Sequence, residues 1–269
     1  MELERKAYQS LFKWKGTYHG TRSLLIEGAR RVGKTWLVRE FGKREYRTCL
    51  LINFSQASGE VFKLFEENAY DLDYLYSALS VIYSVQLYER DSLIVFDEVQ
   101  LCPKARQLTK QMVEDGRYDV ICTGSLLSIR KNTEDIVLPS EEKKLQMYPL
   151  DFEEFLWAKG NRTLFPMIRK AFEDRIPLGH AVHQAAMKEF RQYLLVGGMP
   201  QAVVAYVERN SFQAADAEKR GYPGSLQGRC IEACWEQCSS CTGNIRQIAW
   251  RTGQEGEEVQ SFFPWQERP

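Results

Sequence analysis

One stretch decides the fold of this chain: Gly28-Ala29-Arg30-Arg31-Val32-Gly33-Lys34-Thr35. It follows the apolar residues 24–26 and precedes residues 36–38, whose spacing suits a helix. Strand, glycine-bounded loop and helix, in this order, are the context that the phosphate-binding P-loop pattern requires. The two glycines allow a tight turn, and several N–H groups then converge on one phosphate. The alternative is an ordinary glycine turn followed by a surface lysine.

Each part of the loop has a predicted role toward a nucleotide. The helix begins near Lys34, so its positive end faces the same anion as the loop amides. The Lys34 ammonium reaches the β- and γ-phosphates, and the Thr35 hydroxyl is a ligand for Mg²⁺. The predicted cofactor-binding residues are Gly28, Ala29, Arg30, Arg31, Val32, Gly33, Lys34, Thr35 and Trp36.

A second candidate element ends in two carboxylates. Residues 92–98 form an apolar run that closes on Asp97 and Glu98. In open α/β sheets ligands bind at the carboxyl edge of the strands, where the P-loop also lies. Asp97 is therefore predicted to hold Mg²⁺, through water, and Glu98 to orient and deprotonate the attacking water. The alternative is a strand that ends in solvated acids.

Residues 119–125 are another short buried strand, and it ends in hydroxyl groups. Thr123 and Ser125 are candidates for the polar side chain with which many P-loop ATPases sense the γ-phosphate and align the attacking water. We count Ser125 with Lys34 and Glu98 as predicted catalytic residues. The alternative is a Thr-Gly-Ser turn that caps the next helix.

Bulk properties narrow the class of protein. The 269 residues, 44% of them hydrophobic, allow one large or two modest domains with a core. The 36 acidic and 36 basic residues balance, so the chain as a whole does not indicate a nucleic-acid partner. The sequence has no apolar run long enough for a membrane span, and its first residues do not resemble a signal peptide. We expect a cytoplasmic protein with no membrane partner and with reduced cysteines.

The remaining pattern predicts an α/β domain followed by helices. Residues 1–150 are expected to form the P-loop domain, and residues 151–220 a helical lid or the start of a second domain. Asp71 or Asp73, Pro103 and Asp151 are expected to start helices. Further strands are expected at 48–54 and 146–148, and further helices at 5–14, 61–68, 73–88, 104–113, 167–175, 181–195 and 201–209.

Five blocks of the sequence resemble one known family. GARRVGKTWLVREF, LIVFDEVQLCP, ICTGSLLS, MYPLDFEEFL and YLLVGGMPQAV are similar, in that order, to prokaryotic AAA-type ATPases that carry a C-terminal domain of unknown function. The resemblance spans about residues 1–220. It implies a three-layer P-loop sandwich whose parallel five-stranded sheet has the order 5-1-4-3-2, and it implies ATP and Mg²⁺ as ligands.

The same resemblance implies roles for individual residues. It matches Gly28, Gly33, Lys34 and Thr35 to the phosphate loop, Asp97 and Glu98 to the metal and water positions, and Ser125 to the neighbourhood of the polar sensor. It supplies no arginine finger, since Arg130, Arg162, Arg169 and Arg191 stand in no matching motif. Lys143 and Lys144 either approach a neighbour's phosphate or form a solvated turn.

The family's C-terminal domain does not continue after about Arg220. Residues 221–269 lack periodicity and crowd together Cys230, Cys234, Cys238 and Cys241. The spacing of the last three is that of an iron–sulfur site in radical enzymes, and all four together have the ligand type of a zinc site. The third interpretation is a frameshifted, disordered tail, which the abrupt loss of patterning favours. Translating the encoding DNA in the other two frames tests it.

These observations lead to one expected activity and one alternative. We expect Mg²⁺-dependent hydrolysis of ATP to ADP and phosphate by this chain, as a monomer or within a homo-oligomer. The alternative is a nucleotide-dependent switch with little hydrolysis, which recruits a protein or nucleic-acid partner. The basic residues around the P-loop helix do not by themselves indicate a nucleic-acid partner, because phosphate binding and ordinary solvation explain them equally.

Overall fold

The computed structural model describes residues 1–18, 20–67, 71–125 and 142–221. Met1–Asp216 forms one structural unit, and a second unit begins at Ala217. Arg130 and the four crowded cysteines of residues 221–269 lie outside the described residues, so the interpretations of the tail stay predictions.

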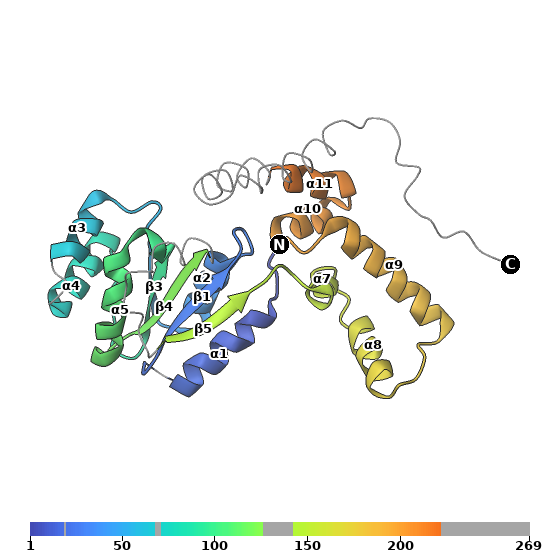
Figure 1. The fold of residues 1–269 in the computed structure, drawn as a ribbon, viewed down its shortest axis with the longest axis horizontal. Coiled ribbons are helices and arrows are strands. Elements are labelled where there is room, and N and C mark those ends of the chain that lie inside the picture. The colour runs from blue at the N-terminus through green and yellow to red at the C-terminus, as the bar shows by residue number, and fades with distance from the viewer. Residues whose placement is uncertain (19, 68–70, 126–141, 222–269) are drawn as a thin grey trace, which may run out of the picture. The chain divides into compact units, whose positions relative to one another are not determined.

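A sheet of five parallel strands lies at the centre of the first part of the chain (Figure 1). The strands are β1 (Ser23–Gly28), β2 (Thr48–Asn53), β3 (Ser92–Asp97), β4 (Asp119–Ser125) and β5 (Glu142–Met147). Their order across the sheet is β2-β3-β4-β1-β5, which confirms the predicted order 5-1-4-3-2. Strand β1 is therefore flanked by β4 and β5, and the carboxyl ends of β1, β3 and β4 meet at one edge.

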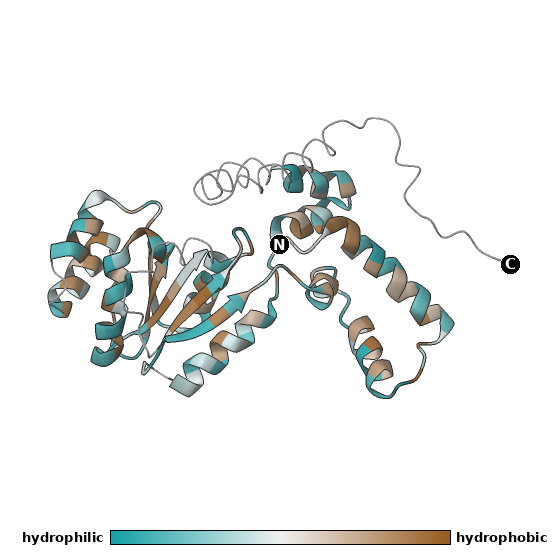
Figure 2. Ribbon diagram, in the orientation of Figure 1, coloured by the Kyte–Doolittle hydropathy of each residue, from teal (hydrophilic) through white to brown (hydrophobic). Residues whose placement is uncertain are grey.

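The three inner strands are buried on both faces and so contribute to two cores. Leu25, Ile94 and Phe96 belong to the core on one face of the sheet. Their chain neighbours Ile26 and Val95 belong to the core on the other face. Because successive side chains of a strand point to opposite faces, a continuous apolar run fills both cores. Figure 2 shows hydrophobic residues along β1 and β3.

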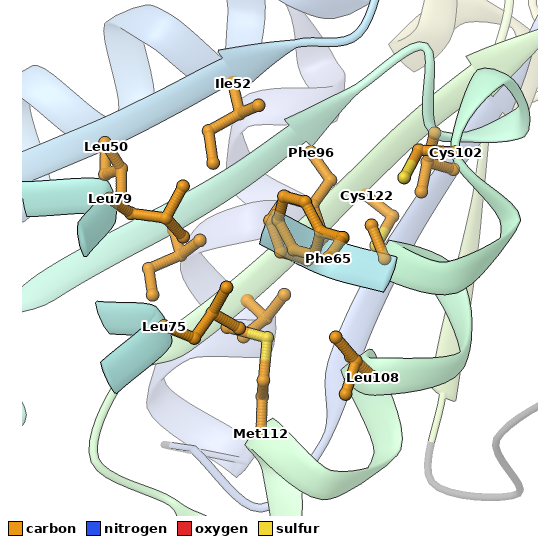
Figure 3. Close-up of a cluster of buried hydrophobic side chains, with 14 of the residues drawn as sticks. Leu50, Ile52, Phe65, Leu75, Leu79, Phe96, Cys102, Leu108, Met112 and Cys122 are labelled. Atoms are coloured by element: carbon orange, nitrogen blue, oxygen red, sulfur yellow. The ribbon is translucent and has the colours of Figure 1, made fainter. Parts of the chain in front are cut away.

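Helices cover both faces and complete the predicted three-layer sandwich. On one face pack α1 (Lys6–Tyr18) and α2 (Lys34–Glu45), through side chains that include Leu11 and Phe41. On the other pack α3 (Gly59–Glu67), α4 (Leu72–Tyr83) and α5 (Pro103–Asp115). Phe65, Leu75 and Met112 of these three helices meet the sheet in the cluster of Figure 3.

The predicted helix starts are confirmed where a capping residue marks them. The Asp71 side chain accepts a hydrogen bond from the Tyr74 N–H at 2.9 Å, so Asp71 and not Asp73 caps α4. Pro103 stands at the first position of α5. Asp151 caps α7 (Phe152–Ala158) in a capping box with Glu154.

Several predicted boundaries were wrong, each for a local reason. Helix α4 ends at Tyr83 instead of residue 88, because Ser84 takes the left-handed conformation (φ 53°) and its N–H bonds back to the last turn. Helix α1 continues to Tyr18, four residues beyond its expected end at residue 14. Strand β5 begins at Glu142, four residues before its expected start. Strand β2 matches its expected range to within one residue, and it is only half buried, because it lies at an edge of the sheet.

After α7 the unit is helical, as expected. It contains α8 (Leu164–Glu173), α9 (His180–Val196), α10 (Pro200–Arg209) and α11 (Phe212–Arg220), the last of which crosses the unit boundary. Residues 197–199, between α9 and α10, pack against the segment that follows β5. There the Leu150 N–H donates to the Gly198 carbonyl at 2.7 Å, and a Cβ on Gly198 would collide with Leu150. Only glycine permits this close approach.

Candidate functional site

The P-loop connects the carboxyl end of β1 with the start of α2 (Figure 1). Arg31 (φ 63°) and Gly33 (φ 94°) hold left-handed conformations, which Gly33 adopts without steric cost. Gly28 serves a different purpose from the predicted one. Its φ is not left-handed, and glycine is needed because a Cβ would collide with the carbonyl oxygen of Met147 on β5.

The other predicted loop residues differ in what they expose. The Val32 side chain is fully buried in the core beneath α2, so Val32 has only its backbone to offer a ligand. Ala29, Arg31 and Trp36 are exposed, and Arg30 is half-buried. The loop therefore presents its main-chain groups above the buried Val32 side chain, and its exposed side chains face solvent around these groups.

Lys34 is a buried lysine at the start of α2, with 6% of its surface exposed. Its ammonium donates to the carbonyl oxygens of Ala29 at 2.8 Å and Gly28 at 3.1 Å, and so closes the loop on itself. Burial lowers the pKa of Lys34, and the nearby Glu98 and Asp97 carboxylates oppose that change. A buried cation beside two acids is suited to stabilise a polyphosphate.

Asp97 ends β3 and gathers donors from three other elements. The Thr35 hydroxyl of α2 donates to its two carboxylate oxygens at 2.9 and 3.0 Å. The Asn53 amide of β2 donates at 3.0 Å, and the Thr123 hydroxyl of β4 donates as well. The structure thus brings Thr35 and Asp97 together, as a shared metal site requires.

Glu98 follows Asp97 directly and is the first residue outside the strand. Its left-handed backbone (φ 55°) turns the chain into the short helix η1 (Val99–Leu101). A non-glycine residue in this conformation is strained, and such strain concentrates at functional sites. The Gln100 amide donates to the Glu98 carboxylate. Glu98 is close enough to Lys34 to influence its pKa.

The two sensor candidates lie on β4, beside the P-loop strand. Ser125 is in register with Gly28, and it is buried. Thr123, two residues earlier, is fully buried, and its hydroxyl is directed at Asp97. Ser125 is therefore the candidate that lies level with the first glycine of the loop, while Thr123 supports the acid.

Two of the arginines considered as fingers form ion pairs with other residues. Arg162 pairs with Glu4 and Arg169 pairs with Glu153. Arg191 is exposed on α9, and Lys143 and Lys144 are exposed on edge strand β5. Among the described residues these contacts give none of the five a place in the P-loop site.

The oxygen atoms at the site suit a hard cation. Mg²⁺ usually keeps several waters and takes only one or two protein oxygens beside those of a phosphate. The Thr35 hydroxyl and the Asp97 carboxylate, 2.9 Å apart, are donors of this kind. The described part of the chain has no cluster of three or more His, Cys, Asp and Glu side chains that could hold a metal by itself. The donor set therefore fits Mg²⁺ that arrives with a nucleotide.

Sequence reasoning missed Asn53 and Arg5. Asn53 ends β2 and bridges Asp97 and Ser55, whose N–H and hydroxyl both donate to its side-chain oxygen. The sequence did indicate Asn53, because it is a polar residue at the end of an apolar strand. Arg5 donates to the Val32 carbonyl in the P-loop at 2.8 Å. No sequence motif contains Arg5, and only its contacts in the structure identify it.

Residues 20–156, about half of the chain, match the AAA domain family. The chain belongs to this family. No curated protein sequence matches it. The structure also describes no helix that is both long and apolar enough to cross a membrane.

Solved structures of similar fold include three from very different sources. PCH-2 of C. elegans is 11% identical, with 80% of this chain and 69% of that one covered and a TM-score of 0.44. AMPPCP-bound DnaA of Aquifex aeolicus is 12% identical, with coverages of 83% and 67% and a TM-score of 0.40. Drosophila ORC bound to DNA is 18% identical, with coverages of 83% and 67% and a TM-score of 0.46.

Proposed function

We propose that this AAA domain protein binds ATP with Mg²⁺ and hydrolyses it to ADP and phosphate. The observation that carries the proposal is the contact between Thr35 and Asp97 at the mouth of the P-loop. A hydroxyl at the helix start and an acid at the end of a neighbouring strand form the pair that holds Mg²⁺ in P-loop NTPases. Buried Lys34 completes the set.

In the proposed reaction each residue acts on a stated atom. Lys34 and the loop N–H groups bind the β- and γ-phosphate oxygens and stabilise the charge that develops there. Glu98 accepts a proton from water as the water oxygen bonds to the γ-phosphorus and the bond to the bridging oxygen of ADP breaks. Ser125 orients that water from β4. Positioning and electrostatic stabilisation supply most of the rate.

A titration with a fluorescent ATP analogue, with and without Mg²⁺, tests the binding step. Lys34→Ala removes a buried cation from the phosphates and should weaken binding about 100-fold or more. Lys43→Ala is the matched control, since Lys43 is an exposed lysine on the same helix that pairs with Glu40. Equal binding by the Lys34→Ala variant and the wild type would exclude the P-loop as the site.

Release of phosphate tests the hydrolysis step. Glu98→Gln keeps the shape of the side chain but removes the base, so the variant should bind the ATP analogue normally and lose turnover. Glu114→Gln is the control, because it makes the same change at an exposed acid on α5 that pairs with Lys110. Normal turnover by Glu98→Gln would show that another group is the base.

A nucleotide-dependent switch is the second candidate function. It is favoured by the contact between Gln100 and Glu98, which holds the proposed base, and by the ion pairs that occupy Arg162 and Arg169. Tight binding with no turnover at any protein concentration would support the switch. Turnover that rises with protein concentration would instead support an oligomer in which a neighbouring copy supplies an arginine.

A further inference from the structure

Arg5 is a buried arginine with no role in any of the sequence motifs. It stands directly before α1, and 4% of its side chain is exposed. A guanidinium never loses its charge in a protein, so burying it is costly unless its N–H groups find partners. The position of Arg5 at the start of a helix does not explain why its side chain is buried.

The guanidinium of Arg5 joins three separate parts of the chain. Nη1 donates to the Val32 carbonyl in the P-loop at 2.8 Å, and Nη2 donates to the Tyr148 carbonyl after β5 at 2.6 Å. Nε donates to the Glu154 carboxylate on α7 at 3.2 Å. The rigid, planar fork of arginine fixes the directions of all three bonds at once, which the single ammonium of lysine does not.

Glu154 accepts hydrogen bonds from other residues as well, so its carboxylate is a fixed partner for Arg5. Its side chain is 5% exposed. Besides Arg5 it accepts the Lys6 N–H at 2.7 Å and the Asp151 N–H at 3.2 Å, the latter as part of the capping box of α7. The charge of Arg5 is thus paired with a carboxylate whose position α7 determines.

The bond to Val32 determines the orientation of one peptide group of the P-loop. The described peptide bonds are trans, so the N–H of Gly33 points away from the carbonyl oxygen of Val32. Arg5 holds that oxygen on the buried side of the loop. The Gly33 N–H is consequently directed to the opposite side, where a phosphate would lie. The left-handed Gly33 has no side chain to resist rotation of this peptide.

We propose that Arg5 is a positioning residue of the P-loop, which orients the Gly33 N–H toward the nucleotide phosphates through the Val32 carbonyl. The inference rests on the proposed function, since it concerns the same phosphate site. Glu154 holds Arg5 in place, so the phosphate site and α7 are joined through one buried ion pair. Arg5 touches no nucleotide atom in this role.

Affinity for the fluorescent ATP analogue in the presence of Mg²⁺ is the first measurement. Arg5→Ala frees the Val32 carbonyl and should weaken binding about 10- to 100-fold, the scale of one hydrogen bond to a charged group. Arg5→Lys keeps the charge but not the fork, and should bind with intermediate affinity. Thermal unfolding of each variant without nucleotide shows whether the fold is retained.

Lys6→Ala is the matched control for a purely structural role. Lys6 is the next residue, and its side chain is 39% exposed. Its ammonium pairs at 2.6 Å with Asp151, which caps α7, and at 2.6 Å with Glu153 of α7. Among the described residues, its ion pairs are with these two acids and not with the P-loop. If Arg5 served only to tie the N-terminus to α7, Lys6→Ala would weaken binding to a similar extent. We expect its affinity to stay within about twofold of the wild type, as for other exposed ion pairs.

The surroundings of the Gly33 amide can be monitored by NMR. Val-Gly occurs only twice in the sequence, at Val32-Gly33 and Val196-Gly197. Labelling valine carbonyls with ¹³C and glycine amides with ¹⁵N therefore selects two NMR signals. Arg5→Lys should shift the Gly33 signal without nucleotide, while the Gly197 signal, from the end of α9, stays in place.

The outcomes separate the two proposals. Wild-type affinity in Arg5→Ala, or a Gly33 signal that Arg5→Lys leaves unchanged, would overturn the positioning role. If the wild type itself bound no nucleotide, the proposed function would fail, and the Gly33 signal would still report whether Arg5 sets the peptide. If the Arg5→Ala variant does not fold, the Arg5→Lys variant can be used for both the affinity titration and the NMR experiment.

Discussion

At the scale of single residues, the site is organised around the Asp97 carboxylate. Donors reach it from the ends of α2, β2 and β4, through Thr35, Asn53 and Thr123. Only 2% of Asp97 is exposed, so its carboxylate oxygens depend on these donors for hydrogen bonds. A divalent cation beside Thr35 and Asp97 would share its charge with this carboxylate, which Asn53 also contacts.

Asn53→Asp tests this arrangement by adding a second carboxylate of the same shape. The Asn53 amide nitrogen lies 3.0 Å from an Asp97 oxygen, so the substitution replaces a hydrogen bond with like-charge repulsion. Without Mg²⁺ the variant should lose about 1–3 kcal/mol of stability, and added Mg²⁺ should restore a large part of it. Thermal unfolding with Mg²⁺ and with EDTA measures both effects.

Asn53→Ala serves as the control, since it removes the same hydrogen bond without adding charge. It should also destabilise the protein, but Mg²⁺ should stabilise it no more than the wild type. Equal responses of the two variants to Mg²⁺ would contradict a cation site beside Asp97.

The sequence was sufficient for the residues that a local motif contains and insufficient for those that only the fold brings in. Lys34 and Thr35 follow from the glycine pattern, and Asp97 follows from its place at the end of an apolar strand. Arg5 and Glu154 are 149 positions apart, and nothing local to either one indicates the other. Glycine at position 28 is required by the approach of Met147, which only the neighbouring strand reveals.

At the scale of elements, strand β5 is secured at its start by a buried ion pair. Arg106 of α5 forms two hydrogen bonds with the Glu142 carboxylate, and their side chains are only 2% and 1% exposed. The pair holds the first residue of an edge strand whose next residues are exposed lysines. Strand β5 also supplies Met147, which contacts the P-loop at Gly28, so its register affects the site.

Removing one partner of this pair should be strongly destabilising. Glu142→Ala leaves the Arg106 charge buried and unpaired, at a cost of about 3–5 kcal/mol of unfolding free energy in urea titrations. The double variant Arg106→Met, Glu142→Leu removes both charges and should recover most of that loss. Lys110→Ala is the control, because Lys110 forms an exposed pair with Glu114 on the same helix. A loss below about 1 kcal/mol for Glu142→Ala would show that the pair does not anchor the strand.

Helix starts could be predicted where the chain carries a capping signal. Asp71, Pro103 and Asp151 each mark a helix start in the sequence and in the structure. The end of α4 at Ser84 carries no such signal, because the left-handed conformation there belongs to a serine and not to a glycine. The exposure of β2 follows from its place at the sheet edge, which periodicity along one strand does not report.

At the scale of the whole molecule, both cores of the sandwich contain thiols that must stay neutral. Cys122 lies in the sheet and is fully buried, and Cys49 packs against the core beneath α2. Burial raises the pKa of each thiol from 9.0 to about 11. Burial also raises the pKa of Tyr46 and Tyr76 above 10.0. The fold therefore opposes ionisation of several acids that ionise freely once the chain unfolds.

This arrangement predicts a loss of stability at alkaline pH. A thiol with a raised pKa in the folded state contributes stability that is complete below pH 9 and is lost as the pH rises toward 11. At pH 10 the loss should be about 1 kcal/mol for each of Cys49 and Cys122. The buried thiol of Cys102 and the tyrosines with raised pKa values add to the loss as the pH nears 10, so a variant is needed to assign the share of Cys49 and Cys122. Urea titrations at pH 8, 9 and 10 with a reducing agent measure the slope.

The variant Cys49→Ala, Cys122→Ala assigns that slope to these two residues. It should be less stable than the wild type at pH 8, because it removes buried sulfur atoms from both cores. Its stability should nevertheless fall by about 2–3 kcal/mol less between pH 8 and 10, since no thiol at these positions ionises in the unfolded chain. The change with pH, and not the stability itself, is the decisive quantity. Parallel lines for the variant and the wild type would show that other groups, not the thiols of the sandwich, set the alkaline limit of this fold.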